Sequence, residues 1–209
     1  MSDTIEYFYA AHSAFAYLGS ARLMAIAAAS GRKIAHKPMD LRRVVAESGA
    51  VPFAKRSRAH IDYFFGREID RWSEQREAPW LGRMPTHHAN DIALPNCFLI
   101  AADAAGQDVD RLAHALLAAH WQKDADLADA AQLAAIARGI GLDPAPLLAA
   151  ATTEPIRAIY RANTEEAIRR AVFGSPTYFV DGDMFYGQDR LEMVERALRR
   201  PYAGTWPRR

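Results

Sequence analysis

Strand-like segments occur at the two ends of this chain, and a long helix-forming stretch separates them. Residues 5–9, Ile-Glu-Tyr-Phe-Tyr, are β-branched or aromatic and predict a strand. From Ser13 onward, apolar residues recur at helical spacing, which predicts a helix that stops near Gly31, and 33–39 predict a second strand. Together these segments indicate a βαβ unit, with a right-handed crossover if its strands are parallel.

The C-terminal end predicts two further strands, at 177–180 and 184–186. The turn between them, Asp181-Gly182-Asp183, is typical of a β-hairpin. A helix from 188 to about 199 follows, and the tail at 201–209 is predicted to be irregular. This end of the chain is therefore a ββα unit.

The middle of the chain is predicted to be helical apart from an irregular stretch at 78–95, which is rich in proline, histidine and asparagine. Its predicted helices cover 42–47, 58–75, 96–105, 110–123, 126–138, a segment that starts at Asp143-Pro144, and 154–171. An insertion within one α/β domain explains this order better than two domains in series. The discontinuous domain would comprise 1–41 and 172–200, and the all-helical insertion 42–171.

Bulk properties exclude several classes of protein. The formal net charge of +1 gives no global attraction to nucleic acid, and charges interrupt the apolar stretches before they could span a membrane. The first residues lack the basic and apolar regions of a secretory signal, which predicts a cytoplasmic protein. The single cysteine, Cys97, excludes an internal disulfide and a Cys-x-x-Cys site, and its apolar surroundings predict an inert buried thiol.

Ser13 stands where the first predicted helix begins. It is either an N-cap that only satisfies the unpaired N–H groups of the first turn, or a group that also binds a ligand there. A helix N-terminus carries a partial positive charge, which lowers the pKa of a nearby thiol. The Ser13 hydroxyl could then donate a hydrogen bond to a bound thiolate without being the nucleophile.

Two C-terminal features could complete such a site. Ser175-Pro176 is either an ordinary connection into a strand or a cis-proline loop, which leaves the backbone of Ser175 open to an extended peptide. Gln188 and Asp189 begin the last helix, where Asp189 either forms a solvated pair with Arg190 or binds an ammonium group.

The middle segment offers weaker candidates. Lys55 and Arg56 belong either to a solvated basic face or to a site for an acidic substrate. His87 and His88 lie in the polar loop, either at the surface or facing a substrate. Adjacent histidines without cysteine or carboxylate partners at ligand spacing do not predict a metal site.

The chain resembles the 2-hydroxychromene-2-carboxylate isomerases, which are relatives of the kappa-class glutathione transferases with a thioredoxin-like, DsbA-like fold. The resemblance extends to about residue 200. It rests on Phe8-Tyr9, Ser13-Ala14-Phe15-Ala16-Tyr17-Leu18, Asp40-Leu41, Asp70-Arg71-Trp72, Val172-Phe173-Gly174-Ser175-Pro176-Thr177 and Met184-Phe185-Tyr186-Gly187-Gln188-Asp189-Arg190-Leu191.

The resemblance implies glutathione as cofactor, a small aromatic acid as substrate, and a homodimer. Ser13 matches the serine that activates glutathione, and Ser175 before Pro176 matches the residue whose backbone pairs with the cysteinyl part. Gln188 and Asp189 match residues near the γ-glutamyl end. The substrate would bind near Lys55, Arg56 and His88, where the alignment is not residue by residue.

Departures from the family pattern bear on the substrate more than on glutathione. Ala14 replaces the proline that often follows the serine, and Ala10-Ala11-His12 replaces a run that often contains aspartate or serine. The asparagine that some members place on the substrate side has no counterpart near Lys55.

The predicted function is a glutathione-dependent cis-trans isomerase that acts by reversible thiolate addition. One alternative is a kappa-like transferase that conjugates glutathione to electrophiles. A second is a thioredoxin-like binding module without catalysis. A thiol-disulfide oxidoreductase would need two nearby cysteines, which this sequence lacks.

Overall fold

The computed structural model describes residues 2–52, 55–204 and 206–207. Its element order confirms the predicted βαβ unit, helical block and ββα unit. In chain order the elements are β1 (Thr4–Tyr9), α1 (Ala14–Ser30), β2 (Lys33–Pro38), α2 (Leu41–Glu47), α3 (Arg58–Asp62), the π-helix η2 (Tyr63–Arg67), α4 (Glu68–Gln75), α5 (Ala93–Ala104), α6 (Val109–Lys123), α7 (Ala130–Gly139), α8 (Pro144–Ala151), α9 (Glu154–Arg169), β3 (Thr177–Val180), β4 (Asp183–Tyr186), the 3-10 helix η3 (Gln188–Arg190) and α10 (Leu191–Arg199).

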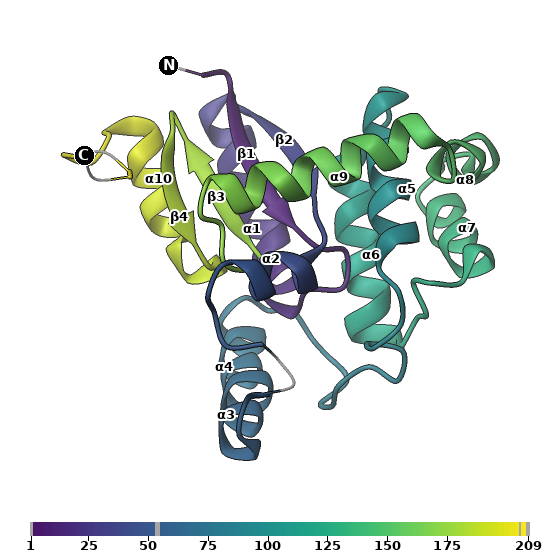
Figure 1. Ribbon diagram of the computed structural model, residues 1–209, viewed down its shortest axis with the longest axis horizontal. Helices are drawn as coiled ribbons and strands as arrows, with labels where there is room; N and C mark the ends of the chain where they lie inside the picture. Colours follow the sequence, from purple (N-terminus) through teal and green to yellow (C-terminus); the bar gives the residue numbers. More distant parts are fainter. Residues whose placement is uncertain (1, 53–54, 205, 208–209) are drawn as a thin grey trace.

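Strands from both ends of the chain form one mixed sheet in the order β2-β1-β3-β4 (Figure 1). β1 is parallel to β2 and antiparallel to β3, and β3 is antiparallel to β4. In the central pair, Ile5 faces Val180 and Phe8 faces Thr177. Because the chain leaves β1 at the same edge at which it enters β3, this pairing brings the loop before Ser13 to the loop that contains Ser175.

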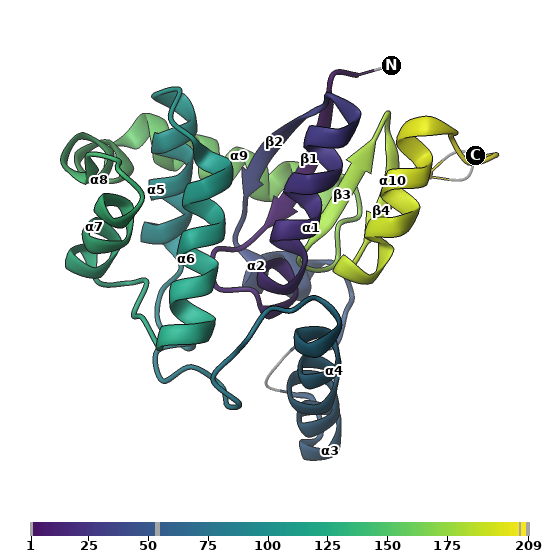
Figure 2. The ribbon, with the colours of Figure 1, turned by 180° about the vertical axis from the view of Figure 1, so that it is seen from behind.

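Side chains that alternate along β1 pack against different helices on the two faces of the sheet. Ile5, Tyr7 and Tyr9 belong to the larger core, which includes side chains of α1 and α10. Phe8 belongs to a smaller core with side chains of α2 and α9. Figures 1 and 2 show these helix pairs on opposite faces. Both faces are covered, which explains why apolar and aromatic residues dominate the strand.

The remaining helices extend from the sheet in two directions. Helix α5 packs beside β2, α6 packs against α1, and α7 and α8 lie on the outer side of α5 and α6, whereas α3 and α4 form an arm that projects from the body (Figure 2). Helix α5 is the centre of the first group, since Phe98, Leu99 and Ala102 are fully buried in it. Cys97 is buried in the same helix, and burial raises the pKa of its thiol. The division of the chain at 41/42 and 171/172 into domain and insertion stays a prediction.

Several predicted helices have different bounds in the structure, and three of these differences have a clear local cause. The helix predicted at 58–75 is interrupted by the π-helical turn Tyr63–Arg67, so it consists of α3, η2 and α4. Helix α5 begins at Ala93, inside the stretch predicted to be irregular, because the first turn tolerates Pro95. Helix α7 begins later than predicted because Asp129, and not an earlier residue, caps it.

The predicted turn signals are confirmed. Gly31 ends α1 in the left-handed conformation, with a φ of 66°. Asp181 and Gly182 have φ values of 49° and 90°, the two positive angles that a tight hairpin turn requires. Asp143 accepts a hydrogen bond from the Ala145 N–H and caps α8, as expected for Asp before a proline.

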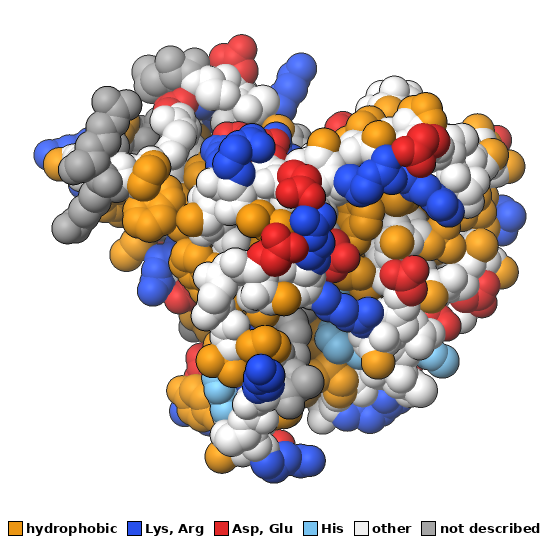
Figure 3. Space-filling model, in the orientation of Figure 1, with side chains coloured by type: hydrophobic (Ala, Val, Ile, Leu, Met, Phe, Trp, Pro, Cys, Tyr) orange, Lys and Arg blue, Asp and Glu red, His pale blue; other side chains and the backbone are white. Residues whose placement is uncertain are grey.

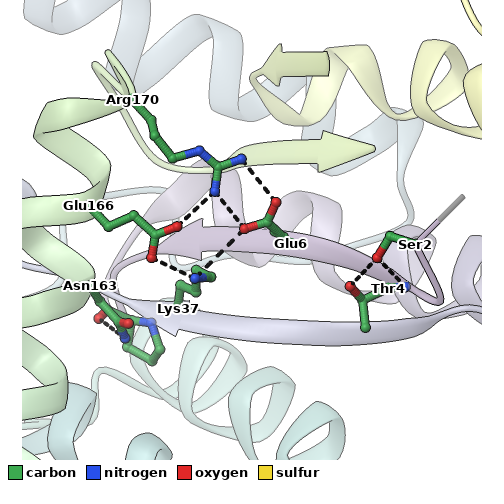
Figure 4. Close-up of polar contacts among 8 residues, drawn as sticks. Ser2, Thr4, Glu6, Lys37, Asn163, Glu166 and Arg170 are labelled. Atoms are coloured by element: carbon green, nitrogen blue, oxygen red, sulfur yellow. Dashed lines mark hydrogen bonds and ion pairs between the residues drawn. The ribbon is translucent and has the colours of Figure 1, made fainter. Parts of the chain in front are cut away.

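A network of charged side chains lies between α9 and the sheet (Figure 4). The Arg170 guanidinium binds the Glu6 carboxylate oxygens at 2.6 and 2.9 Å and the Glu166 Oε1 at 2.8 Å, and it covers the Phe179 ring. Lys37 donates to the Glu166 Oε2 at 2.6 Å. Burial raises the pKa of Glu166, but Lys37 and Arg170 outweigh it and lower this pKa. The network therefore joins α9 to β1 and β2.

Replacing Gly19 by alanine should destabilise the protein by roughly 1–3 kcal/mol, because the added methyl group overpacks a filled site. A Cβ at Gly19 would lie 2.7 Å from the Gln188 Cβ and 3.1 Å from the Tyr178 hydroxyl. Urea unfolding measures the change. Gly66→Ala is the matched control, since open space surrounds Gly66 and alanine is the better helix former. Equal effects at both positions would contradict the packing argument.

Arg170→Met should lower the free energy of unfolding by about 1.5–3 kcal/mol, because two half-buried carboxylates lose a charged donor. Thermal and urea denaturation at pH 7 test this expectation. Arg161→Met removes an arginine that pairs with Glu154 at the exposed surface, where a change of about 0.5 kcal/mol or less is expected. If the Arg161 variant loses as much stability as the Arg170 variant, the network does not stabilise the packing of α9 against the sheet.

Candidate active site

Ser13 caps α1, as one of its two predicted roles requires. Its backbone is extended, with φ −71° and ψ 124°, and its hydroxyl accepts a hydrogen bond from the Ala16 N–H at 3.3 Å. The same hydroxyl donates to the Ser175 carbonyl oxygen at 3.2 Å. The predicted meeting of the N-terminal helix and the proline loop is thus a direct contact between these two serines.

Helices of the middle segment hold the turn that leads to Ser13. The buried Asn96 side chain of α5 accepts from the Ala11 N–H at 2.9 Å and donates to the Met39 carbonyl oxygen at 3.2 Å. The Trp121 indole of α6 donates to the His12 carbonyl oxygen at 2.9 Å. These bonds satisfy buried backbone groups that no strand pairs, and they fix where α1 begins.

The proline loop is tied to the sheet on both sides. The Ser175–Pro176 peptide bond is cis. The Ser175 hydroxyl accepts a hydrogen bond from the Ala10 N–H at 3.2 Å, and the Pro176 carbonyl oxygen accepts one from the Gly187 N–H at 2.9 Å. These contacts set the Ser175 backbone beside the start of α1.

Ser13, Ser175, Arg56 and His88 line one cavity of about 500 Å³. Figure 3 shows hydrophobic and histidine side chains where the surface is hollowed between the α3–α4 arm and the body. The cavity walls are largely aromatic, and they include Phe15, Phe64, Phe65, Trp121, Phe173 and Tyr186. Arg42 also lines the cavity, and no carboxylate does so among the residues that the structure describes. The cavity suits a flat, apolar ligand with a negative charge.

Gln188 and Asp189 lie next to this cavity and do not line it. Gln188 is buried against α1, and its Oε1 accepts a hydrogen bond from Arg76 at 3.1 Å. Asp189 pairs with Arg190. Burial, with a smaller contribution from the charge of Asp189, raises the pKa of Tyr186, whose ring is part of the cavity wall. Lys55 is exposed and is not one of the lining residues.

Two further histidines join His88, although no sequence pattern singles them out. The His12 and His88 rings are 4.7 Å apart, and the His88 Nδ1 lies 3.1 Å from the His120 Nε2. Burial and the neighbouring imidazoles lower the pKa of His12 far below its usual value and that of His88 to about 4. Burial also lowers the pKa of His120. All three rings are therefore neutral near pH 7.

A four-stranded thioredoxin-like sheet, a serine N-cap and a cis-proline loop define a thioredoxin-fold protein whose site contains no cysteine. The chain belongs to the DSBA-like thioredoxin domain family, whose pattern matches residues 4–199.

Individual relatives agree with this class. The 2-hydroxychromene-2-carboxylate isomerase of Sphingobium xenophagum is 28% identical over 199 residues, which are 95% of this chain and 99% of that protein. A solved structure of a 2-hydroxychromene-2-carboxylate isomerase has a TM-score of 0.82 at 25% identity and covers 94% of this chain and 95% of that one. These matches confirm the predicted resemblance and support isomerase activity.

A more distant structure shares the fold alone. The cytosolic disulfide reductase DsbM from Pseudomonas aeruginosa, solved with GSH, has a TM-score of 0.65 at 18% identity and covers 95% of this chain and 93% of that one. In the described part of our chain, no group of three or more His, Cys, Asp or Glu side chains is arranged to hold a metal ion. None of the helices there has both the length and the apolar character needed to cross a membrane.

The neutral imidazoles should make the protein less stable in mild acid. A histidine whose pKa is lower in the folded than in the unfolded state has little effect on the free energy of unfolding above its unfolded pKa of about 6.5. Below that pH, the free energy of unfolding falls until the pH reaches the folded pKa. For His88, with a folded pKa of about 4, the loss between pH 7 and pH 5 should be roughly 2 kcal/mol.

Urea unfolding of wild type and His88→Gln at pH 7 and pH 5 isolates this contribution from that of the carboxylates. The variant should lose less stability on acidification. The exposed His60 on α3 provides the control, because His60→Gln should keep the wild-type pH dependence. An unchanged dependence in the His88 variant would show that His88 is charged or solvated in the folded protein.

Proposed function

We propose that this protein is a glutathione-dependent isomerase of aromatic α-keto acids of the 2-hydroxychromene-2-carboxylate type. The main support is the contact of the Ser13 hydroxyl, at a helix N-terminus, with the Ser175 carbonyl oxygen at the rim of an aromatic, cation-lined cavity. The isomerase relatives support the reaction class.

The residues present fit the backbone and thiol of glutathione. Within the described residues, no acceptor pairs with the Ser175 N–H, so it is open to an extended peptide. The buried Gln188 Nε2 also lacks a hydrogen-bond partner in that part of the chain, and Asp189 follows it at the start of η3. We assign the cysteinyl part to Ser175 and Pro176, and the γ-glutamyl end to Gln188 and Asp189.

Ser13 would stabilise the charge of the bound thiol. Its hydroxyl now donates to a neutral carbonyl, and a hydrogen bond to a thiolate is stronger because the acceptor is charged. The α1 N-terminus adds its partial positive charge. When bound, glutathione supplies a thiolate that adds reversibly to a conjugated double bond, so that rotation occurs about a single bond.

The cavity walls would bind the substrate. Phe15, Phe64 and Phe173 offer apolar area for an aromatic ring. Arg56 lies over the Phe64 and Phe65 rings at 5.7 and 5.6 Å and presents a guanidinium for a carboxylate. We place Lys55 at the outer edge of this site, since it is exposed. The proposal includes a homodimer, as the family resemblance implies, and the cytoplasmic location predicted separately.

An ultraviolet difference titration near 240 nm with glutathione tests the thiolate site. Wild type should bind glutathione with a thiol pKa below the ordinary value of about 8.5. Ser13→Ala and Ser13→Gly should raise that pKa by about one to two units, because the lost hydrogen bond to a charged group is worth about 1.5–3 kcal/mol. Glycine keeps most of the capping stability, so it separates loss of the hydroxyl from loss of the helix end.

Ser30→Ala removes a hydroxyl at the far end of α1 and should leave the titration unchanged. Product analysis with 2-hydroxychromene-2-carboxylate then decides the reaction. A rearranged product without bound glutathione identifies the isomerase, and a stable glutathione conjugate identifies the transferase. Failure of glutathione to bind would leave the binding module as the better description.

A further inference from the structure

The three clustered histidines form an ordered chain of rings. The His12 ring lies against the His88 ring at an interplanar angle of 37°, and the His88 Nδ1 lies 3.1 Å from the His120 Nε2. At the inner end, the His120 Nδ1 lies 2.9 Å from the Ala125 carbonyl oxygen. Trp121 meets the His88 ring edge-on, at a centroid distance of 5.3 Å. His88 is therefore held on more than one side within the cavity wall.

The inner carbonyl fixes the protonation pattern of the chain. A carbonyl oxygen only accepts, so the His120 Nδ1 must carry a hydrogen. The neutral His120 ring then offers its Nε2 as an acceptor, and the His88 Nδ1 must donate to it. A neutral His88 with hydrogen on Nδ1 has an unprotonated Nε2. The hydrogen bonds thus leave a basic nitrogen on a residue that lines the cavity.

The charges around the cluster favour this neutral state at His88. Arg42, from α2, opposes protonation of both His12 and His88. Asp124 and Asp126, just beyond the last residue of α6, raise the pKa of His120 and so oppose the lowering of this pKa by burial. The Asp126 carboxylate also lies 3.6 Å from the His87 Nδ1. The two carboxylates act on His120, and neither is among the described residues that line the cavity.

Other groups that line the cavity are poor proton acceptors. Arg42 and Arg56 are permanently charged donors, and no carboxylate lines the cavity in the described residues. Burial raises the pKa of Tyr186, which keeps its hydroxyl protonated. The His12 Nδ1 is buried without a partner in the described part of the chain, so no bond fixes its tautomer.

We propose that His88 Nε2 is the general acid-base group that opens the ring of a 2-hydroxychromene substrate, and that His120 is its positioning residue. This inference rests on the proposed function. A 2-hydroxychromene has a hydroxyl group and the ring oxygen on the same carbon, so it is a cyclic hemiketal. Opening it requires a proton to move from the hydroxyl to the ring oxygen.

His88 alone can carry out both proton transfers of this step. The hydroxyl O–H bond breaks, its proton passes to Nε2, and its electron pair forms the keto C=O bond. The bond between that carbon and the ring oxygen breaks, with its electron pair on the ring oxygen. This oxygen takes the proton back from Nε2 and becomes a phenol. His88 is neutral before and after the step, and His120 stabilises the transient imidazolium through the Nδ1–H bond.

The first test needs no glutathione and no turnover. Long-range ¹H–¹⁵N correlation spectra of histidine-labelled protein at pH 7 report which ring nitrogen carries hydrogen. We expect hydrogen on Nδ1 of both His88 and His120, with assignments from His88→Gln and His120→Gln. A hydrogen on the His88 Nε2, or a charged His88 ring, would overturn the proposal.

The second test compares two substrates with glutathione present. One is 2-hydroxychromene-2-carboxylate, and the other is an open-chain benzylidenepyruvate without the ring hydroxyl, which cannot form a hemiketal. His88→Gln should lower kcat about 100-fold on the first and leave the second nearly unchanged, because only the first needs the proton transfer. His120→Leu should slow the first substrate alone, and His120→Gln should restore it, because its amide oxygen accepts from Nδ1–H.

His114→Gln is the matched control, since His114 is a half-buried histidine that bonds Ser20 outside the cavity. It should behave as wild type on both substrates. Equal slowing of both substrates by His88→Gln, or no slowing, would refute the role of His88 and leave the isomerase function intact. If wild type turns over neither substrate, the proposed function fails and the catalytic role of His88 fails with it.

Discussion

The position of Ser13 depends on one buried amide side chain. Asn96 binds the Ala11 N–H and the Met39 carbonyl oxygen, two backbone groups that lie beyond the ends of β1 and β2. Removing that amide would leave both groups buried and unpaired, at a cost of about 1–3 kcal/mol for each. The N-cap, its contact with Ser175 and the mouth of the cavity follow from where this turn is held.

Among the described residues that line the cavity, Arg42 and Arg56 carry full charges, and the other electrostatic contributions come from dipoles and neutral rings. The α1 N-terminus and the Ser13 hydroxyl suit an anion, and Arg42 and Arg56 line the same cavity. Burial, the neighbouring imidazoles and Arg42 lower the pKa values of His12 and His88, and burial lowers that of His120, so these histidines stay neutral. The cavity can therefore bind negative groups through its arginines and still contain the proposed base, because a neutral histidine can accept a proton.

Much of the fold could be predicted from local sequence patterns. Gly31, the Asp181-Gly182 turn and the Ser13 cap act within a few residues, so their signals are complete in short segments. The prediction that Ser13 and Ser175 share one site depended on the family resemblance, because the residues are far apart in sequence. In the structure, the β1–β3 pairing brings them together. The chain of His12, His88 and His120 has no local signal. It forms because Trp121, Asn96 and the loop before α5 converge on one turn, and spacing along the sequence does not encode that convergence.

Helix α6 connects the two halves of the site. His120 and Trp121 are neighbours on this helix, and their side chains make hydrogen bonds to different segments. Trp121 holds the His12 carbonyl oxygen before the N-cap, and His120 holds His88 in the loop across the cavity. A shift of α6 would move the serine turn and the proposed base together. The helical segment is thus more than a cover over a thioredoxin-like sheet, because the geometry that relates the anion site to the base is set by one of its helices.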